Sequence, residues 1–130
     1  MLKSVLSIAV IATGLGFSAT AAASVESELQ NICSIVKADD KGQLRKKMSS
    51  VQKNFSLKLQ DYYGGITCDG NSLIRTAFLA GSVESGSLLV KKMPKSQLNA
   101  PEQDGQTLRA WVSENGLMDS PIAEVLNNRI

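Results

Sequence analysis

The stretch Cys68-Asp-Gly-Asn-Ser-Leu-Ile-Arg-Thr-Ala-Phe-Leu-Ala-Gly81 decides the expected fold, because it carries every signal for one complete helix. Asp69-Gly70 is a tight-turn dipeptide, and Ser72 is a favourable helix N-cap. A mostly apolar run follows, and Gly81 supplies the left-handed position that commonly ends a helix. The stretch therefore predicts a tight turn and then a short, buried helix that stops at Gly81.

A second copy of this pattern lies 35 residues further along, in Asp104-Gly-Gln-Thr-Leu-Arg-Ala-Trp-Val-Ser-Glu-Asn-Gly116. The two copies align without a gap at Asp69/Asp104, Gly70/Gly105, Ser72/Thr107, Leu73/Leu108 and Gly81/Gly116. A fixed period of this length is typical of arrays in which each repeat is a helix pair. The fold is therefore expected to be all-α.

Residues 1–23 are expected to be a secretory signal peptide. A basic start at Lys3 precedes an apolar run from Val5 to Phe17, and small residues then lead to Ala21 and Ala23, which fit cleavage before Ser24. A cut after Ala21 is the alternative, and the run is short for a membrane anchor of about 20 apolar residues. Cleavage would leave a single domain, residues 24–130, and we expect it in the periplasm.

Charge and composition restrict the function. Without Lys3, 13 of the 14 basic residues remain against 12 acidic ones, so the net charge of +1 gives no general attraction to nucleic acid. The sequence contains no histidine, which excludes Ser-His-Asp and Cys-His catalysis and histidine-containing metal sites. No paired-carboxylate spacing and no glycine-rich phosphate loop stands out. We therefore expect no enzyme activity and no metal or organic cofactor.

Cys33 and Cys68 are the only cysteines, and export would place both in an oxidising compartment. A disulfide between them is the expected state, and closing a 35-residue loop would contribute roughly 3–4 kcal/mol by the chain-entropy argument. A redox pair is the alternative. The cysteines lack the Cys-x-x-Cys spacing of such pairs, so we favour a structural bridge.

Apolar periodicity and capping residues predict three antiparallel helix pairs, at about residues 25–52, 72–93 and 107–128. Thr107 and Ser120-Pro121 are the expected starts of the two helices in the last pair, and Trp111 is an expected inter-helix anchor. Gly86 would weaken the second pair by about 1 kcal/mol relative to alanine. Pro94 is expected to end that pair, and Lys95–Gln103 to be a loop. The conformation of residues 54–67 stays open between an irregular and a helical arm.

The repeated pattern resembles the ankyrin repeat. The matching residues are Asp69, Gly70, Ser72, Ile74, Ala77, Gly81, Glu84, Leu88 and Leu89, with Asp104, Gly105, Thr107, Gly116 and Asp119 in the second copy. The resemblance implies short antiparallel helix pairs stacked side by side. The chain departs from it at Leu73 and Leu108, where the ankyrin repeat has proline, and at Arg75 and Ala110, where it has histidine.

A second resemblance covers Leu29 to Met93. Cys33, a cluster of basic residues and the motif Cys68-Asp69-Gly70 resemble a family of small exported bacterial proteins with a Cys-Asn-Gly motif. That family is classed as a domain of unknown function. The resemblance implies a compartment and a shared fold, and it implies no activity.

Two candidate surfaces follow from these patterns. Helix-pair arrays bind proteins through their turn tips, so an unknown periplasmic protein is the expected partner, with Tyr62, Tyr63, Asn71 and Gln106 as candidate contacts. Core cover is the competing role of the two tyrosines. The alternative function is binding to anionic lipid or lipopolysaccharide through a basic helix face formed by Arg45, Lys46, Lys47 and Lys53, with Lys58 beside it. A solvated helix face is the competing role of these cations.

Overall fold

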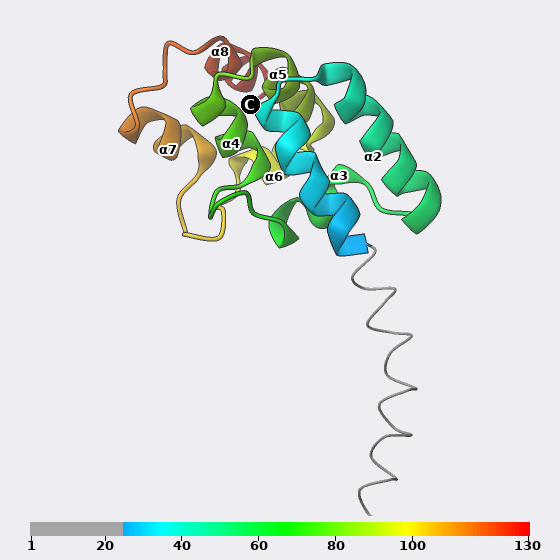
Figure 1. Ribbon diagram of the computed structural model, residues 1–130. Helices are drawn as coiled ribbons and strands as arrows, with labels where there is room; N and C mark the ends of the chain where they lie inside the picture. The colour runs from blue at the N-terminus through cyan, green and yellow to red at the C-terminus, as the bar shows by residue number, and fades with distance from the viewer. Residues whose placement is uncertain (1–24) are drawn as a thin grey trace, which may run out of the picture.

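The computed structural model describes residues 25–130, and this part of the chain is all-α (Figure 1). Residues 25–37 form the N-terminal helix. The helices that follow are α2 (Lys41–Phe55), α3 (Leu59–Tyr62), the 3-10 helix η1 (Tyr63–Gly65), α4 (Leu73–Ala80), α5 (Val83–Lys92), α6 (Lys95–Asn99), α7 (Leu108–Glu114) and α8 (Pro121–Arg129). The expected signal peptide lies outside the described residues. No helix among residues 25–130 is long and apolar enough to cross a bilayer.

The predicted starts of α4, α7 and α8 and the predicted stop of α4 are confirmed. Ser72 caps α4 by accepting a hydrogen bond from the backbone N–H of Arg75, and Thr107 caps α7 in the same way with Ala110. Ser120 caps α8, with Pro121 in its first turn. Gly81 ends α4 with a φ of 69°, in the left-handed region that a Cβ disfavours. Local chemistry therefore sets the ends of these helices.

Helix α5 lies at the centre of the packing. It packs against α4, its partner in the pair, and also against α2 and α8. At Gly86 on α5, a Cβ atom would lie 2.6 Å from Cδ1 of Ile122 on α8 and 3.1 Å from Cβ of Ala77 on α4. The missing side chain lets three helices approach closely, so Gly86 favours the packing even though glycine lowers helix propensity.

The apolar core runs through all the helix pairs. Ile32, Leu44, Leu73, Leu89 and Ile122 are fully buried. Trp111 on α7 is also buried and meets Phe78 on α4 edge-to-face, with ring centroids 6.0 Å apart. Such aromatic pairs stabilise contacts beyond the area they bury. The prediction that Trp111 anchors one helix against another is confirmed.

Two predictions about the connecting segments need correction. Residues 95–99 form the short helix α6, where a loop was expected. Pro94 ends α5, but its carbonyl oxygen accepts hydrogen bonds from the N–H groups of both Gln97 and Leu98, and the resulting turn buries the Leu98 side chain. Helix α2 also continues to Phe55, three residues beyond the expected end at Gln52. The open segment 54–67 contains α3 and η1 and then runs extended at Ile66.

Candidate functional site

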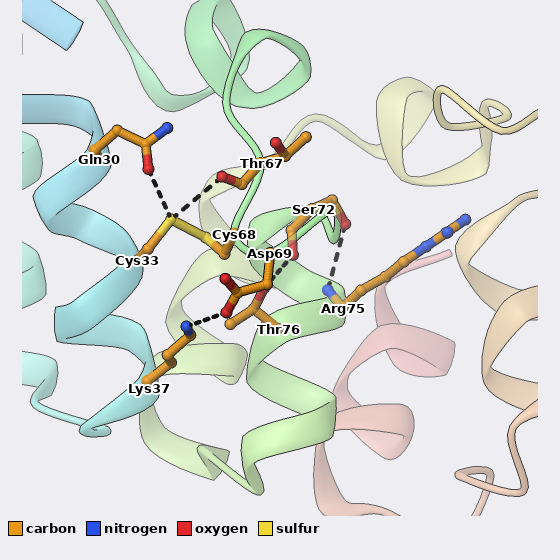
Figure 2. The surroundings of a disulfide bond; sticks show 9 residues. All are labelled: Gln30, Cys33, Lys37, Thr67, Cys68, Asp69, Ser72, Arg75 and Thr76. Carbon is orange, nitrogen blue, oxygen red and sulfur yellow. Dashed lines mark hydrogen bonds and ion pairs between the residues drawn. A yellow bond between two sulfur atoms is a disulfide. The ribbon is translucent and has the colours of Figure 1, made fainter.

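The disulfide and the Asp-Gly turn hold the start of α4 against the N-terminal helix (Figure 2). Cys33 and Cys68 are bonded with their Cα atoms 5.6 Å apart, which confirms the structural bridge. Cys68 and Asn71 exchange two backbone hydrogen bonds across Asp69-Gly70, both of which have positive φ, as expected of a tight two-residue turn. Lys37 adds an ion pair to Asp69 at 2.6 Å. The covalent and polar links thus meet at one turn.

A partly buried cluster of polar side chains lies directly beyond this turn. Tyr63 donates a hydrogen bond to Glu102 at 2.6 Å, and Ser72 donates to the other oxygen of the same carboxylate at 2.9 Å. Tyr63 and Ser72 also lie 3.0 Å apart, oxygen to oxygen. Burial raises the pKa of Tyr63 well above its ordinary value, and the neighbouring Glu102 carboxylate raises it further. Glu102 therefore ties the segment before α4 to the segment after α6.

Arg75 extends this group from α4 toward α7. Its Nη1 and Nη2 donate to the two oxygens of Asp104 at 2.7 and 3.0 Å, and Nη2 also reaches the carbonyl oxygen of Gln106. Its Nε lies 2.7 Å from Glu102, within ion-pair distance but outside hydrogen-bond geometry. Its guanidinium carbon lies 5.2 Å from the ring centroid of Trp111, a cation–π contact. We call Tyr63, Ser72, Arg75, Glu102 and Asp104 the Arg75 cluster.

The charges of the Arg75 cluster depend on one another. The hydrogen bonds from Arg75 lower the pKa of Asp104 to about 2. The same hydrogen bonds raise the pKa of Arg75 above its ordinary value, against the opposing effect of burial. The carboxylate of Asp104 thus stays ionised far into acid and keeps the loop before α7 attached to α4.

A cleft of about 770 Å³ opens beside the Arg75 cluster. One wall is the segment from Gln60 to Ser72, and the other runs from Met93 to Asp104. Two exposed glycines, Gly64 and Gly65, form part of the first wall, and Gln103 on the second wall donates a hydrogen bond to the carbonyl oxygen of Gly64. The volume of this cleft lies within the range of ordinary ligand pockets. We call this space the turn cleft.

The predicted contact residues fall in different places. Tyr62 and Tyr63 are only 4% and 8% exposed, which favours the competing role of core cover, although Tyr63 also lines the turn cleft. Both belong to the core, and Tyr63 points its hydroxyl into the Arg75 cluster while burial raises the pKa of Tyr62 to about 12. Asn71 and Gln106 are partly exposed, but their backbone groups are used in the turn at Cys68 and in the contact with Arg75.

The predicted basic face is mostly exposed. Arg45, Lys46 and Lys53 on α2 are exposed, and so is Lys58 just beyond it. Lys47 differs from these residues, because it is partly buried and forms an ion pair with Glu28 of the N-terminal helix at 2.9 Å. The available positive charge of α2 is therefore carried by Arg45, Lys46 and Lys53.

One family matches more than half of the chain. The family described as "Protein of unknown function (DUF3718)" matches residues 32–100. The chain belongs to this family. The DUF3718 match runs from the N-terminal helix through α6 and includes both cysteines, whereas the loop with Glu102 and Asp104, α7 and α8 lie beyond it. No curated protein and no solved structure matches the chain.

Sequence reasoning missed the central role of Arg75 and Glu102 in this DUF3718 protein. The signal was present in the otherwise apolar run Leu73–Ala80, whose single charged residue is Arg75. A cation within a buried helix requires a counter-charge, and the polar segment before Thr107 holds Glu102 and Asp104. That reasoning would have linked the two segments that form the walls of the turn cleft.

Proposed function

We propose that this chain is a non-catalytic protein-binding module of the periplasm and that the turn cleft receives an extended segment of a partner protein. The observation that carries this proposal is that two segments joining successive helix pairs, residues 60–72 and 93–104, line the same cleft. Segments between elements carry binding residues most often when a rigid scaffold positions them. The disulfide and the Arg75 cluster supply that rigidity on one side of the cleft.

The proposal also assigns an ankyrin-like order to the helix pairs. Its support is the series of contacts from α2 to α5 and from α5 to α8, since these are the second helices of three successive pairs. Segments that join successive pairs of such a stack fall on a common edge. Residues 60–72 and 93–104 both join one pair to the next, in agreement with that arrangement.

The proposal of a non-catalytic role is supported by how the polar groups are used. The sequence has no histidine to act as a base. Asp104 is held by Arg75, and both oxygens of Glu102 accept hydrogen bonds from Tyr63 and Ser72. Groups that are paired in this way organise the walls of the cleft and are not available for proton transfer. Export to the periplasm is supported by the disulfide, which is typical of oxidising compartments.

A blocking substitution tests the proposal. Gly65 lines the turn cleft, and a Cβ at this position would meet nothing within 4 Å, so Gly65→Trp adds bulk to the cleft without disturbing the core. Ser113→Trp on the exposed face of α7 is the matched control. Periplasmic extract is passed over the immobilised wild type and both variants, and bound proteins are quantified by mass spectrometry.

The expected result is one or more proteins that the wild type and Ser113→Trp retain and that Gly65→Trp loses at least about ten-fold, or 1.4 kcal/mol. Equal retention by Gly65→Trp would refute the role of the cleft. Retention of nothing above a blank resin by the wild type would refute the protein-binding function itself. Circular dichroism of the three proteins confirms that each is folded.

The second candidate function is contact with an anionic envelope surface. The exposed residues Arg45, Lys46 and Lys53 on α2 favour it, because their charges are available, whereas Lys47 is paired with Glu28. Charge reversal of Lys46 and Lys53 should then abolish salt-sensitive binding to anionic vesicles. Binding that does not depend on salt would rule this function out.

A further inference from the structure

A second hollow of about 530 Å³ lies between α2, the start of α3 and the end of α5. Its lining consists of Arg45, Met48, Ser49, Gln52, Lys58, Leu59, Gln60 and Lys92. We call it the basic pocket. It adjoins the turn cleft at α3, where Gln60 lines both.

Three cations from three parts of the chain meet around this pocket. Arg45 comes from α2, Lys58 from the residue before α3, and Lys92 from the last residue of α5. Among the described residues, no carboxylate belongs to the lining. Within residues 25–130, none of the three cations forms an ion pair, whereas the neighbouring Lys41 and Lys47 pair with Glu84 and Glu28. The positive charge of the pocket is thus left uncompensated by the described residues.

Asp61, the acidic residue closest in sequence to Lys58, does not line the basic pocket. Asp61 on α3 accepts a hydrogen bond from the backbone N–H of Lys58 and lines the turn cleft. The remaining polar side chains of the basic pocket, Ser49, Gln52 and Gln60, are neutral and can donate hydrogen bonds. Met48 and Leu59 add an apolar surface beside them.

We propose that the basic pocket binds the phosphate group of a phosphomonoester, with Arg45, Lys58 and Lys92 as its ligands. A phosphomonoester carries between one and a half and two negative charges near neutral pH, about as many as two of the cations neutralise. The guanidinium of Arg45 can hold two phosphate oxygens at once, while each lysine acts as a point charge. The apolar surface of Met48 and Leu59 would contact the organic part of the ligand.

This site is distinct from the proposed protein-binding function. It shares one lining residue with the turn cleft and requires no partner protein. It also differs from general attraction of a basic face to a membrane, because Lys46 and Lys53 do not line it. Those two residues therefore provide the control.

The test is a titration of the ¹⁵N-labelled mature protein with inorganic phosphate, at constant ionic strength maintained with sodium chloride. The expected result is saturable shifts in the amide signals of Ser49, Leu59 and Gln60. The double variant Arg45→Gln/Lys92→Gln should bind phosphate at least about ten-fold more weakly, which corresponds to 1.4 kcal/mol. Lys46→Gln/Lys53→Gln removes the same charge and should change the affinity less than about two-fold.

All four substituted residues are exposed, so each variant is expected to fold, and circular dichroism checks this. Linear, non-saturating shifts in the wild type would overturn the proposal. Equal weakening in the two double variants would also overturn it, because phosphate would then respond to overall charge and not to the pocket.

Vesicles distinguish the source of the phosphate. Neutral phosphatidylcholine vesicles with and without phosphatidic acid, a lipid whose headgroup is a phosphomonoester, are sedimented with the protein. Binding to phosphatidic acid that inorganic phosphate displaces supports a lipid ligand, and phosphate binding without vesicle binding supports a soluble one. Vesicle binding that persists in Arg45→Gln/Lys92→Gln and resists displacement by phosphate would contradict the pocket and favour the basic face.

Discussion

Arg75 and Asp104 lie 29 positions apart in the chain and form a two-pronged ion pair, with nitrogen–oxygen distances of 2.7 and 3.0 Å. This ion pair joins the turn before α7 to α4, which belongs to the preceding helix pair. The same guanidinium lies beside Glu102 and over Trp111. Arg75 therefore connects the two walls of the turn cleft to the aromatic contact that holds α4 and α7 together.

Removal of Arg75 should destabilise the fold strongly. In Arg75→Met, the Glu102 side chain, which is 10% exposed, would lose its cation, and we expect a loss of about 3 kcal/mol in the free energy of unfolding. Arg75→Lys should recover only part of this, because an ammonium cannot form the two-pronged contact. Denaturant unfolding measures both. Arg109→Met on the exposed face of α7 is the control, and an equal effect there would contradict the role of Arg75.

The stability of the protein should fall in acid through Asp104. The Arg75 hydrogen bonds lower the pKa of this carboxyl from 3.8 to about 2 in the folded protein. A lowered folded-state pKa contributes stability that is complete above the unfolded pKa and is lost as the pH falls from about 4 to 2. Asp104→Asn should therefore show a smaller loss of stability than the wild type over that window. Parallel curves for the two proteins between pH 4 and pH 2 would refute this coupling.

A methyl group at Gly86 should destabilise the helix packing. In Gly86→Ala, the new Cβ would lie 2.6 Å from Cδ1 of Ile122, and overpacking of this kind costs roughly 1–3 kcal/mol, more than the helix propensity gained. Ile122→Val removes that Cδ1 atom. Thermal unfolding of the single and double variants should show that Gly86→Ala is less harmful in the Ile122→Val background. A stabilising effect of Gly86→Ala alone would mean that propensity dominates.

Loss of the disulfide should lower stability by about 3 kcal/mol, less any strain released, because the bond closes a loop with a sequence separation of 35. Cys33→Ser/Cys68→Ser removes it.

Intact mass with and without reductant and alkylation first establishes that the wild type is oxidised, and the same spectrum locates its N-terminus. Free thiols in the wild-type protein would contradict the bridge and the oxidising compartment. Ser24 as the first residue would confirm the expected cleavage site.

Replacement of Asp69 by asparagine should leave the stability of the protein unchanged. Asp69 has a φ of 53°, and asparagine adopts this left-handed conformation readily. The ion pair with Lys37 is exposed, so its loss should have little effect. Asp69→Asn is therefore expected to melt at the wild-type temperature, whereas Asp69→Val, whose branched side chain disfavours positive φ, should melt lower. A clear loss of stability in Asp69→Asn would show that the Lys37 contact matters more than the turn.

Local rules predicted the helical elements well. Ser72, Thr107 and Ser120 were expected caps, and each accepts a backbone hydrogen bond in the structure. Capping, turn formation and left-handed stops involve neighbours within a few residues, so the sequence alone carries the information. The same rules failed at residues 95–99, where Pro94 suggested a loop. The turn there buries Leu98, and its formation depends on the core that receives this side chain.

The candidate surfaces were harder to predict, because exposure is a tertiary property. Tyr62 and Tyr63 occupy a polar, glycine-rich turn in the sequence, yet the chain folds back over both rings. The role of Glu102 depends on contacts with Tyr63, Ser72 and Arg75, which lie 27 to 39 positions before it. Short-range sequence patterns do not specify contacts between residues that lie so far apart in the chain.

The sequence by itself determined the class of fold, the helix boundaries near capping residues and the pairing of the only two cysteines, because each depends on local geometry or on the absence of alternatives. Tertiary structure alone decided that Arg75 would be buried between two carboxylates, that Gly86 would admit Ile122, and that Arg45, Lys58 and Lys92 would surround one pocket. The physical reason is the same in each case. Side chains distant in sequence acquire their burial and their charge environment only when the helices and the segments that join them pack together.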